Sequence, residues 1–74
     1  MFNDDLKKIK QSCKMIVLNY YKTTFDVYYD ENYSEQRARY LAVREIDDGH
    51  CKNSFLHEII IHKNEAGEEM VVVI

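Results

Sequence analysis

The sequence of 74 residues contains no proline, two glycines and two cysteines, and these low counts exclude several classes of structure. Two isolated glycines cannot form the glycine-rich loop that holds phosphate groups. Cys13 and Cys51 are too few for a disulfide framework, so free thiols are expected. A chain so poor in proline and glycine, with 46% hydrophobic and 31% charged residues, is typical of an ordered globular domain rather than of a disordered segment.

Long hydrophobic runs are also missing from the sequence. The longest, Met15 to Leu18 and Met70 to Ile74, fall far short of the ~20 apolar residues that span a bilayer. The amino-terminal sequence MFNDDLKK has no apolar stretch that could serve as a signal peptide. These absences predict a cytoplasmic protein without membrane contact, built as one small domain over residues 1–74.

The charges are unevenly distributed along the chain. Ten basic and 13 acidic residues give a net charge of −3, which provides no general attraction to nucleic acid. Residues 1–22 carry five Lys and two Asp, a net charge of +3, whereas residues 23–74 carry five basic and eleven acidic groups, a net charge of −6. A basic beginning is thus followed by an acidic remainder.

The amino-terminal segment has apolar residues at alternating steps of four and three. This spacing predicts an amphipathic helix that continues through about residue 14. Beyond it, Met15, Leu18 and Tyr21 would lie opposite the helix stripe or beside it. Two alternatives follow: the helix becomes buried on all sides, or the chain leaves the helix near Met15.

Four further elements can be located. Residues 23–30 alternate between apolar and polar side chains, which predicts a half-buried strand. Residues 35–46 have the composition of a helix, with Ser34 as its N-cap. Residues 55–62 and 69–74 are predicted strands of a hairpin, with Gly67 at positive φ in the turn and Lys63 paired with Glu68.

These elements predict a single α+β domain in the order helix, strand, helix, strand, strand. A three-stranded sheet with both helices packed on one face is the economical arrangement. The alternation in residues 23–30 and the predicted hairpin pairing leave Tyr28, Ile60, Val71 and Val73, among polar neighbours, on the uncovered face. Because such a face is too apolar to remain in contact with water, we expect a protein partner or a second copy of the chain, as a homodimer, to cover it.

Tyrosine is unusually frequent, with six residues, and several lie among acidic side chains in residues 26–33. An acidic, tyrosine-rich sheet face suits contact with a protein, and it can imitate nucleic acid in the basic groove of a nucleic-acid-handling enzyme. The alternative is that these rings only cover the edges of the sheet and helices. The predicted partner-binding residues are Met15, Leu18, Tyr21, Asp26, Tyr28, Asp30, Tyr33, Ile60, Val71 and Val73.

Metal and thiol chemistry are weakly indicated. His57 and His62 would face opposite sides of one strand and could not converge on a zinc ion. Cys51 lies beside His50, but no glycine-rich oxyanion turn accompanies this pair. We therefore predict no metal, no cofactor and no catalytic residue. A minimal metal- or thiol-dependent enzyme is the hypothesis that we rank third.

The competing hypothesis is a nucleic-acid-binding regulator. Its candidate contacts are Lys7, Lys10 and Lys14 on one side of the first helix, and Arg37, Tyr40 and Arg44 on a stripe of the second. Basic groups that flank an aromatic ring can meet phosphates and a base, but the net negative charge opposes binding. We expect instead a small, non-enzymatic intracellular protein that inhibits or regulates a larger protein, of the kind that phages and other mobile elements encode.

Overall fold

The computed structural model describes residues 2–49 and 57–74, and side chains from Asp5 onward within these ranges. The elements in chain order are α1 (Phe2–Gln11), β1 (Lys14–Tyr20), β2 (Thr23–Tyr29), α2 (Glu35–Asp47), β3 (Glu58–Lys63) and β4 (Glu69–Val73). The α+β class agrees with the prediction. The predictions that involve His50 and Cys51 lie outside the described residues.

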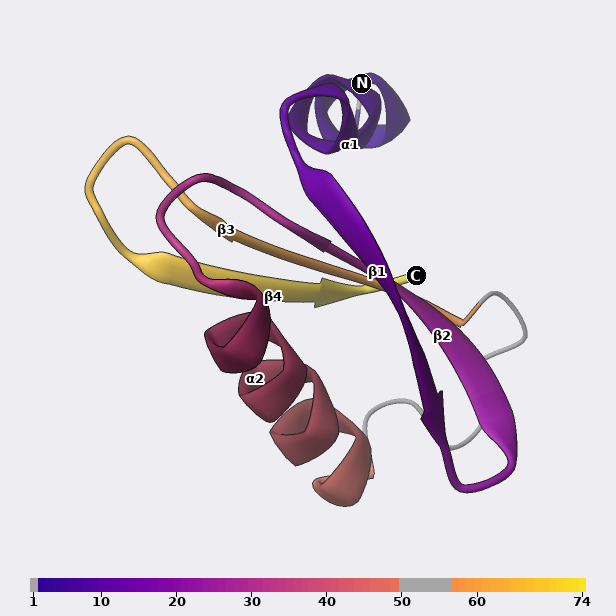
Figure 1. Cartoon of the computed structure of the whole chain (residues 1–74). Helices are drawn as coiled ribbons and strands as arrows, with labels where there is room; N and C mark the ends of the chain where they lie inside the picture. The colour runs from indigo at the N-terminus through magenta and orange to yellow at the C-terminus, as the bar shows by residue number, and fades with distance from the viewer. Residues whose placement is uncertain (1, 50–56) are drawn as a thin grey trace.

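Within the described residues, the sheet has four strands in the order β1-β2-β3-β4, one more than predicted. β1 and β2 form an antiparallel pair, β2 and β3 a parallel pair, and β3 and β4 a second antiparallel pair. The parallel pair requires a crossover connection, and this connection contains α2. Figure 1 shows the sheet between α1 on one side and α2 on the other.

The additional strand, β1, occupies the segment for which the sequence left two alternatives. α1 ends at Gln11, earlier than the predicted residue 14, and the Ser12 hydroxyl donates to the carbonyl of Lys8 at its end. The chain then leaves the helix, as the second alternative stated, and pairs with β2 through a turn of two residues, Tyr21 and Lys22. Both turn residues have positive φ, 51° and 60°, as a type I′ hairpin turn requires.

The predicted hairpin of β3 and β4 is confirmed, but its predicted register is wrong by one residue. Lys63 pairs with Glu69 rather than with Glu68. The backbone N–H of Asn64 donates to the Glu68 carbonyl, and the backbone N–H of Glu68 donates to the side-chain carbonyl of Asn64. These bonds close a loop that is longer than predicted and includes Gly67 at φ 81°. A shift of one residue moves every side chain of a strand to the other face. Val71 and Val73 therefore face α2, not the opposite side.

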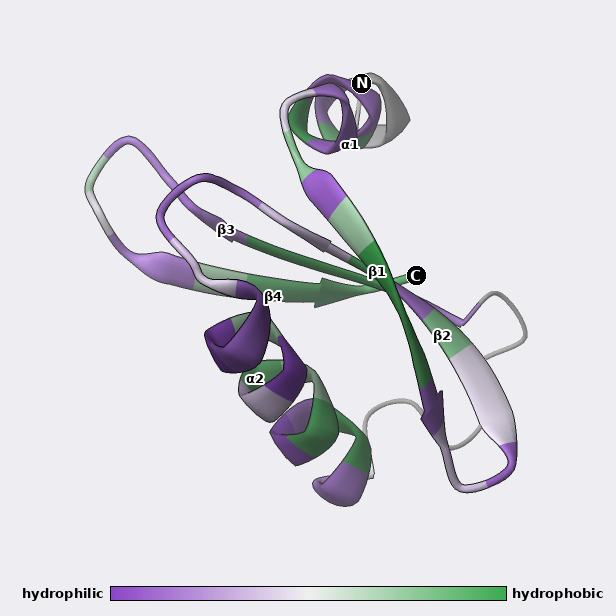
Figure 2. Ribbon diagram, in the orientation of Figure 1, coloured by the Kyte–Doolittle hydropathy of each residue, from purple (hydrophilic) through white to green (hydrophobic). Residues whose placement is uncertain are grey.

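The main core lies between the sheet and α2. α2 begins as predicted, with the Ser34 hydroxyl accepting from the backbone N–H of Arg37 at 3.1 Å. Its apolar face packs on alternate residues of the strands, and Figure 2 shows hydrophobic residues concentrated in β1, β3 and β4. The buried residues of this core are Leu18, Phe25, Val27, Tyr29, Tyr33, Ala38, Leu41, Ala42, Ile46, Ile59 and Ile61.

The prediction that both helices pack on one face is wrong. Ile60 points away from α2, because its neighbours Ile59 and Ile61 point toward it, yet Ile60 is 0% exposed. α1 covers this second face and buries Leu6 to 8% exposure. The crossover between β2 and β3 restricts α2 to one face, whereas α1 precedes the sheet and is free to cover the other.

Candidate functional site

Large hydrophobic side chains remain exposed mainly along one edge of the molecule. In the ranges that the structure describes, five such residues are exposed, and three of them are Met15 (48%), Val17 (49%) and Tyr21 (65%). Met15 and Val17 are two residues apart on β1 and therefore share a face, the one that α1 covers elsewhere. Tyr21 follows the strand in the hairpin turn. We call these three residues the β1 edge patch.

The patch is exposed because α1 lies over the middle of the sheet. Leu6, Lys7 and Lys10 line a hollow with Glu58 of β3 and Ile74, and residues 5, 8 and 9 line another with residues 62–65. Toward β1, α1 reaches as far as β2, where the Lys10 Nζ lies 4.7 Å from the centroid of the Tyr28 ring. β1 is the next strand, and its residues Met15 and Val17 on this face remain about half exposed.

Lys10 holds α1 on this face through a charged contact. Its Nζ donates to Glu58 Oε1 at 2.9 Å, and both side chains are about three-quarters buried, at 28% and 25% exposure. The hydrogen bond to Glu58 is the main cause of a pKa of Lys10 above its ordinary value, opposed by partial burial. Lys10 is thus part of the fold and does not offer a free charge to a phosphate.

The outer edge of β1 also presents unpaired backbone groups. In a hairpin with a two-residue turn, the residues that flank the turn, Tyr20 and Thr23, form a hydrogen-bonded pair, and such pairs recur at every second position. Met15, Val17 and Asn19 therefore direct their N–H and C=O groups away from β2. The Asp26 N–H agrees with this alternation, because it donates to His57 of the β3 segment at 2.9 Å rather than to Val17 opposite.

Features that commonly protect an edge strand are scarce on β1. Its pairing with β2 continues through all seven residues without interruption, so no bulge twists the edge away. It has no proline, and its only charged residue is Lys14 at one end. A long edge strand with exposed apolar residues and a single charge at one end is a template for pairing with another chain.

The predicted acidic, tyrosine-rich face does not form one open surface. Tyr33 is buried against α2, and its hydroxyl donates to Glu69 at 3.3 Å; burial and the Glu69 charge raise its pKa to about 12. Tyr28 and Asp26 are half-buried on the α1 side, where Tyr28 lies beneath Lys10. Asp30 bonds the backbone at the end of β3. These residues mainly serve the fold.

Four other residues of the predicted partner surface are placed differently from the prediction. Leu18 is buried in the α2 core, and Ile60 is buried under α1. Val71 and Val73 are half-buried against the α2 core because of the one-residue register shift. The chain covers with its own helices most of the face that the sequence left uncovered. Of the predicted partner-binding residues, Met15 and Tyr21 remain exposed, and Val17, which sequence reasoning missed, joins them.

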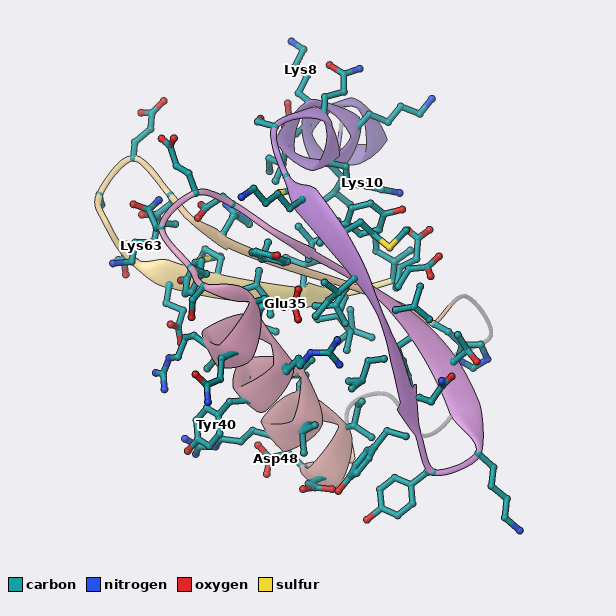
Figure 3. All side chains as sticks on the ribbon, viewed as in Figure 1. Lys8, Lys10, Glu35, Tyr40, Asp48 and Lys63 are labelled. Atoms are coloured by element: carbon teal, nitrogen blue, oxygen red, sulfur yellow. The ribbon has the colours of Figure 1, made fainter. Side chains whose placement is uncertain are left out.

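The basic residues of the competing hypothesis are divided between two sides of the molecule. Arg37 and Arg44 stack over Tyr40, with the Cζ atoms 5.1 and 5.7 Å from the ring centroid, on the exposed side of α2. Lys7 and Lys10 belong to α1, whereas Lys14 begins β1 on the α2 face of the sheet, as its partner Tyr29 does. Figure 3 shows Lys8 and Lys10 on α1 and Tyr40 on α2, at opposite sides of the sheet. The two sets do not form one basic surface, and the Tyr40 ring already carries two guanidinium groups.

The groups considered for metal or thiol chemistry are scattered. Among the described residues, no three His, Cys, Asp or Glu side chains lie close enough to hold a metal ion. Cys13 is half-buried, and burial, with a smaller effect of the Asp30 charge, raises the pKa of its thiol, which disfavours the reactive thiolate.

Among the residues that the structure describes, no helix is long and apolar enough to cross a membrane.

Comparison with models of known protein families, with curated proteins and with solved structures finds no match for this chain.

Proposed function

We propose that this chain is a non-enzymatic protein-binding domain that binds another polypeptide along the outer edge of β1. The observation that carries the proposal is the coincidence, on one strand, of exposed apolar side chains with outward-facing backbone groups. Backbone hydrogen bonds contribute affinity when a strand is added to a sheet edge, and alternate side chains contribute specificity. Met15 and Val17 are the side chains that a bound strand would cover on one face.

Side-chain burial and backbone hydrogen bonds would both contribute to the free energy of binding, against the entropy cost of association. Complete burial of a Val or Met side chain contributes about 1.5–3 kcal/mol, so covering the exposed halves of Met15 and Val17 contributes about 1 kcal/mol each. Each backbone hydrogen bond adds about 1 kcal/mol net. Inhibition of a nucleic-acid-handling enzyme stays a prediction about the effect of such binding, because the chain is acidic.

The test uses two variants that introduce the same charge on opposite edges. Val17→Lys places a lysine in the middle of β1, and Met70→Lys places one on β4, where Met70 is also exposed. Tagged wild-type chain and both variants are used to capture partners from the native cell, and hydrogen exchange is then measured on the captured complex. We expect capture by the wild type and Met70→Lys but not by Val17→Lys.

Hydrogen exchange adds a signature specific to strand addition. The amides of Met15, Val17 and Asn19 should become protected on binding, whereas those of Ile16 and Leu18 are already bonded to β2 and should change little. A polypeptide that binds equally to Val17→Lys, or that protects α2 instead of β1, would show that the binding surface lies elsewhere.

A further inference from the structure

We propose that the polypeptide bound by β1 is a second copy of this chain, joined by antiparallel pairing of the two β1 strands about a two-fold axis at Val17. This inference rests on the proposed function and names the partner. The two four-stranded sheets would then form one continuous sheet of eight strands. Both copies of α2 would lie on one face of this sheet and both copies of α1 on the other.

The register follows from the direction of the backbone groups. Val17 is the middle residue of the seven in β1, and its N–H and C=O point outward. An axis at Val17 places Val17 opposite its own copy, and Met15 opposite Asn19 of the second copy. All three outward-facing residues are then paired, which gives ~6 hydrogen bonds between the copies. An axis at any other position in β1 leaves some of these groups unpaired.

In this register the positive charge of Lys14 in one copy lies near a negative charge of the other. Lys14 falls opposite Tyr20 of the second copy, on the α2 face of the sheet. The Tyr20 hydroxyl donates to Asp47 Oδ1 at 2.9 Å, and this bond is the main reason that the pKa of Tyr20 is raised to about 12. A negative charge therefore stands near the position that the second Lys14 would reach. In-register parallel pairing would instead place the two Lys14 residues side by side.

The apolar surface is also self-complementary. On the α1 face, the two copies of Val17 would meet at the axis with a Met15 on either side, so the exposed residues of each copy cover those of the other. On the α2 face, Ile16 lies opposite Leu18 of the second copy, which extends the two cores toward each other. The row that meets at the axis contains no charge that would oppose association.

The other edge of the sheet is less suited to self-pairing. β4 has five residues, and acidic Glu65, Glu68 and Glu69 gather at one of its ends. Its outward-facing residues Val71 and Val73 already pack partly against the α2 core. A chain of net charge −3 gains little by joining two acidic edges.

Sedimentation equilibrium of the purified full chain over a range of concentrations tests the proposal. We expect a reversible monomer–dimer equilibrium for the wild type and an unchanged one for Met70→Lys. Val17→Lys should weaken the dimer by at least tenfold, because two lysines would face each other at the axis. Val17 is half exposed, so circular dichroism of dilute samples should show the same fold in the variant and the wild type.

A charge exchange distinguishes self-pairing about Val17 from other modes of association. Lys14→Glu should weaken the dimer severalfold, and the double variant Lys14→Glu, Asp47→Lys should recover it, because each copy then offers the reversed pair. Loss of dimer in the single variant without recovery in the double variant would contradict the register.

Cross-linking tests the same register directly. With Cys13 and Cys51 replaced by serine, Val17→Cys should form a disulfide-linked dimer under mild oxidation, since Cα atoms of directly opposed bonded residues lie about 5.5 Å apart. Met70→Cys in the same background should remain monomeric.

The two proposals can fail separately. A chain that stays monomeric at all concentrations, while a different captured protein is lost in Val17→Lys, would overturn the second copy as partner and leave the β1 binding site intact. A dimer that is unaffected by Val17→Lys, together with capture that is also unaffected, would overturn both.

Discussion

Asp30 follows β2 and bonds two backbone N–H groups with its carboxylate, that of Lys63 at 2.9 Å and that of Asn32 at 2.8 Å. Partial burial acts to raise the pKa of Asp30, but these hydrogen bonds outweigh it, so the pKa lies below its ordinary value. A residue that the sequence marked as part of an acidic binding surface thus ties the end of β2 to the end of β3.

This role predicts a pH-dependent contribution to stability. Because the folded-state pKa is lowered, the ionised Asp30 stabilises the fold above its unfolded pKa of about 3.9. That stability is lost as the pH falls through the folded-state value. We expect Asp30→Asn to lower the free energy of unfolding by about 1 kcal/mol at pH 7.

The difference between wild type and Asp30→Asn should shrink as the pH is lowered below about 4, because Asp30 is protonated first in the unfolded state and, below its lowered folded-state pKa, in both states. Urea unfolding at pH 7 and pH 3 measures it. Glu31→Gln, at an exposed neighbour, is the control and should show no such difference. An equal effect of Asp30→Asn at both pH values would assign the destabilisation to something other than the charge.

At the scale of elements, the turn between β1 and β2 uses residues that are poorly suited to its geometry. Tyr21 and Lys22 both have positive φ. This backbone conformation costs residues other than glycine about 1–2 kcal/mol each. We expect Lys22→Gly to raise the free energy of unfolding by about 1 kcal/mol, measured by denaturant titration of dilute protein. Gly67→Ala is the reciprocal control.

Gly67 has φ 81°, and a Cβ added there would meet no atom within 4 Å. Gly67→Ala should therefore destabilise by about 1 kcal/mol through backbone strain alone. If Lys22→Gly destabilised the protein instead, the type I′ geometry of the β1–β2 turn would be wrong, and with it the alternation that directs the Val17 backbone outward.

The amino-terminal helix α1 is a second element whose role can be measured. Leu6 is buried under α1 on the face that contains Ile60. Leu6→Ala should lower the free energy of unfolding by about 2–3 kcal/mol, because it removes apolar contact and leaves a cavity. Lys7→Ala, its exposed neighbour, should change stability by less than about 0.5 kcal/mol. Similar small effects of both variants would mean that α1 does not stabilise the second face.

At the scale of the whole molecule, self-association predicts that thermal stability depends on concentration. A ligand that binds only the folded state raises the unfolding temperature, and in a homodimer the second copy is that ligand. The unfolding temperature of the wild type should rise between micromolar and millimolar chain, whereas that of Val17→Lys should stay constant. Differential scanning calorimetry measures both, and a constant value for the wild type would argue against a dimer in this range.

The sequence alone located elements whose signals are local. The alternation in residues 23–30 and the Ser34 cap led to β2 and α2 nearly as they are, and Gly67 has the predicted positive φ. Hydrogen bonds, propensity and periodicity within a few residues are sufficient for such features. The segment after Gln11 carried no decisive local signal, because Met15, Val17 and Leu18 suit either a buried helix or a strand.

The tertiary structure decided the faces, the register and therefore the site. Whether Val71 or Val72 faces α2 depends on a single residue in the length of the β3–β4 loop. After α2 has packed on one face, Ile60 is left on the other, and α1 covers that face. These choices balance contacts between residues far apart in the chain, which no local pattern records. The amino-acid sequence determined that apolar surface would be left over after folding; only the packing of both helices placed that surface on the edge of β1.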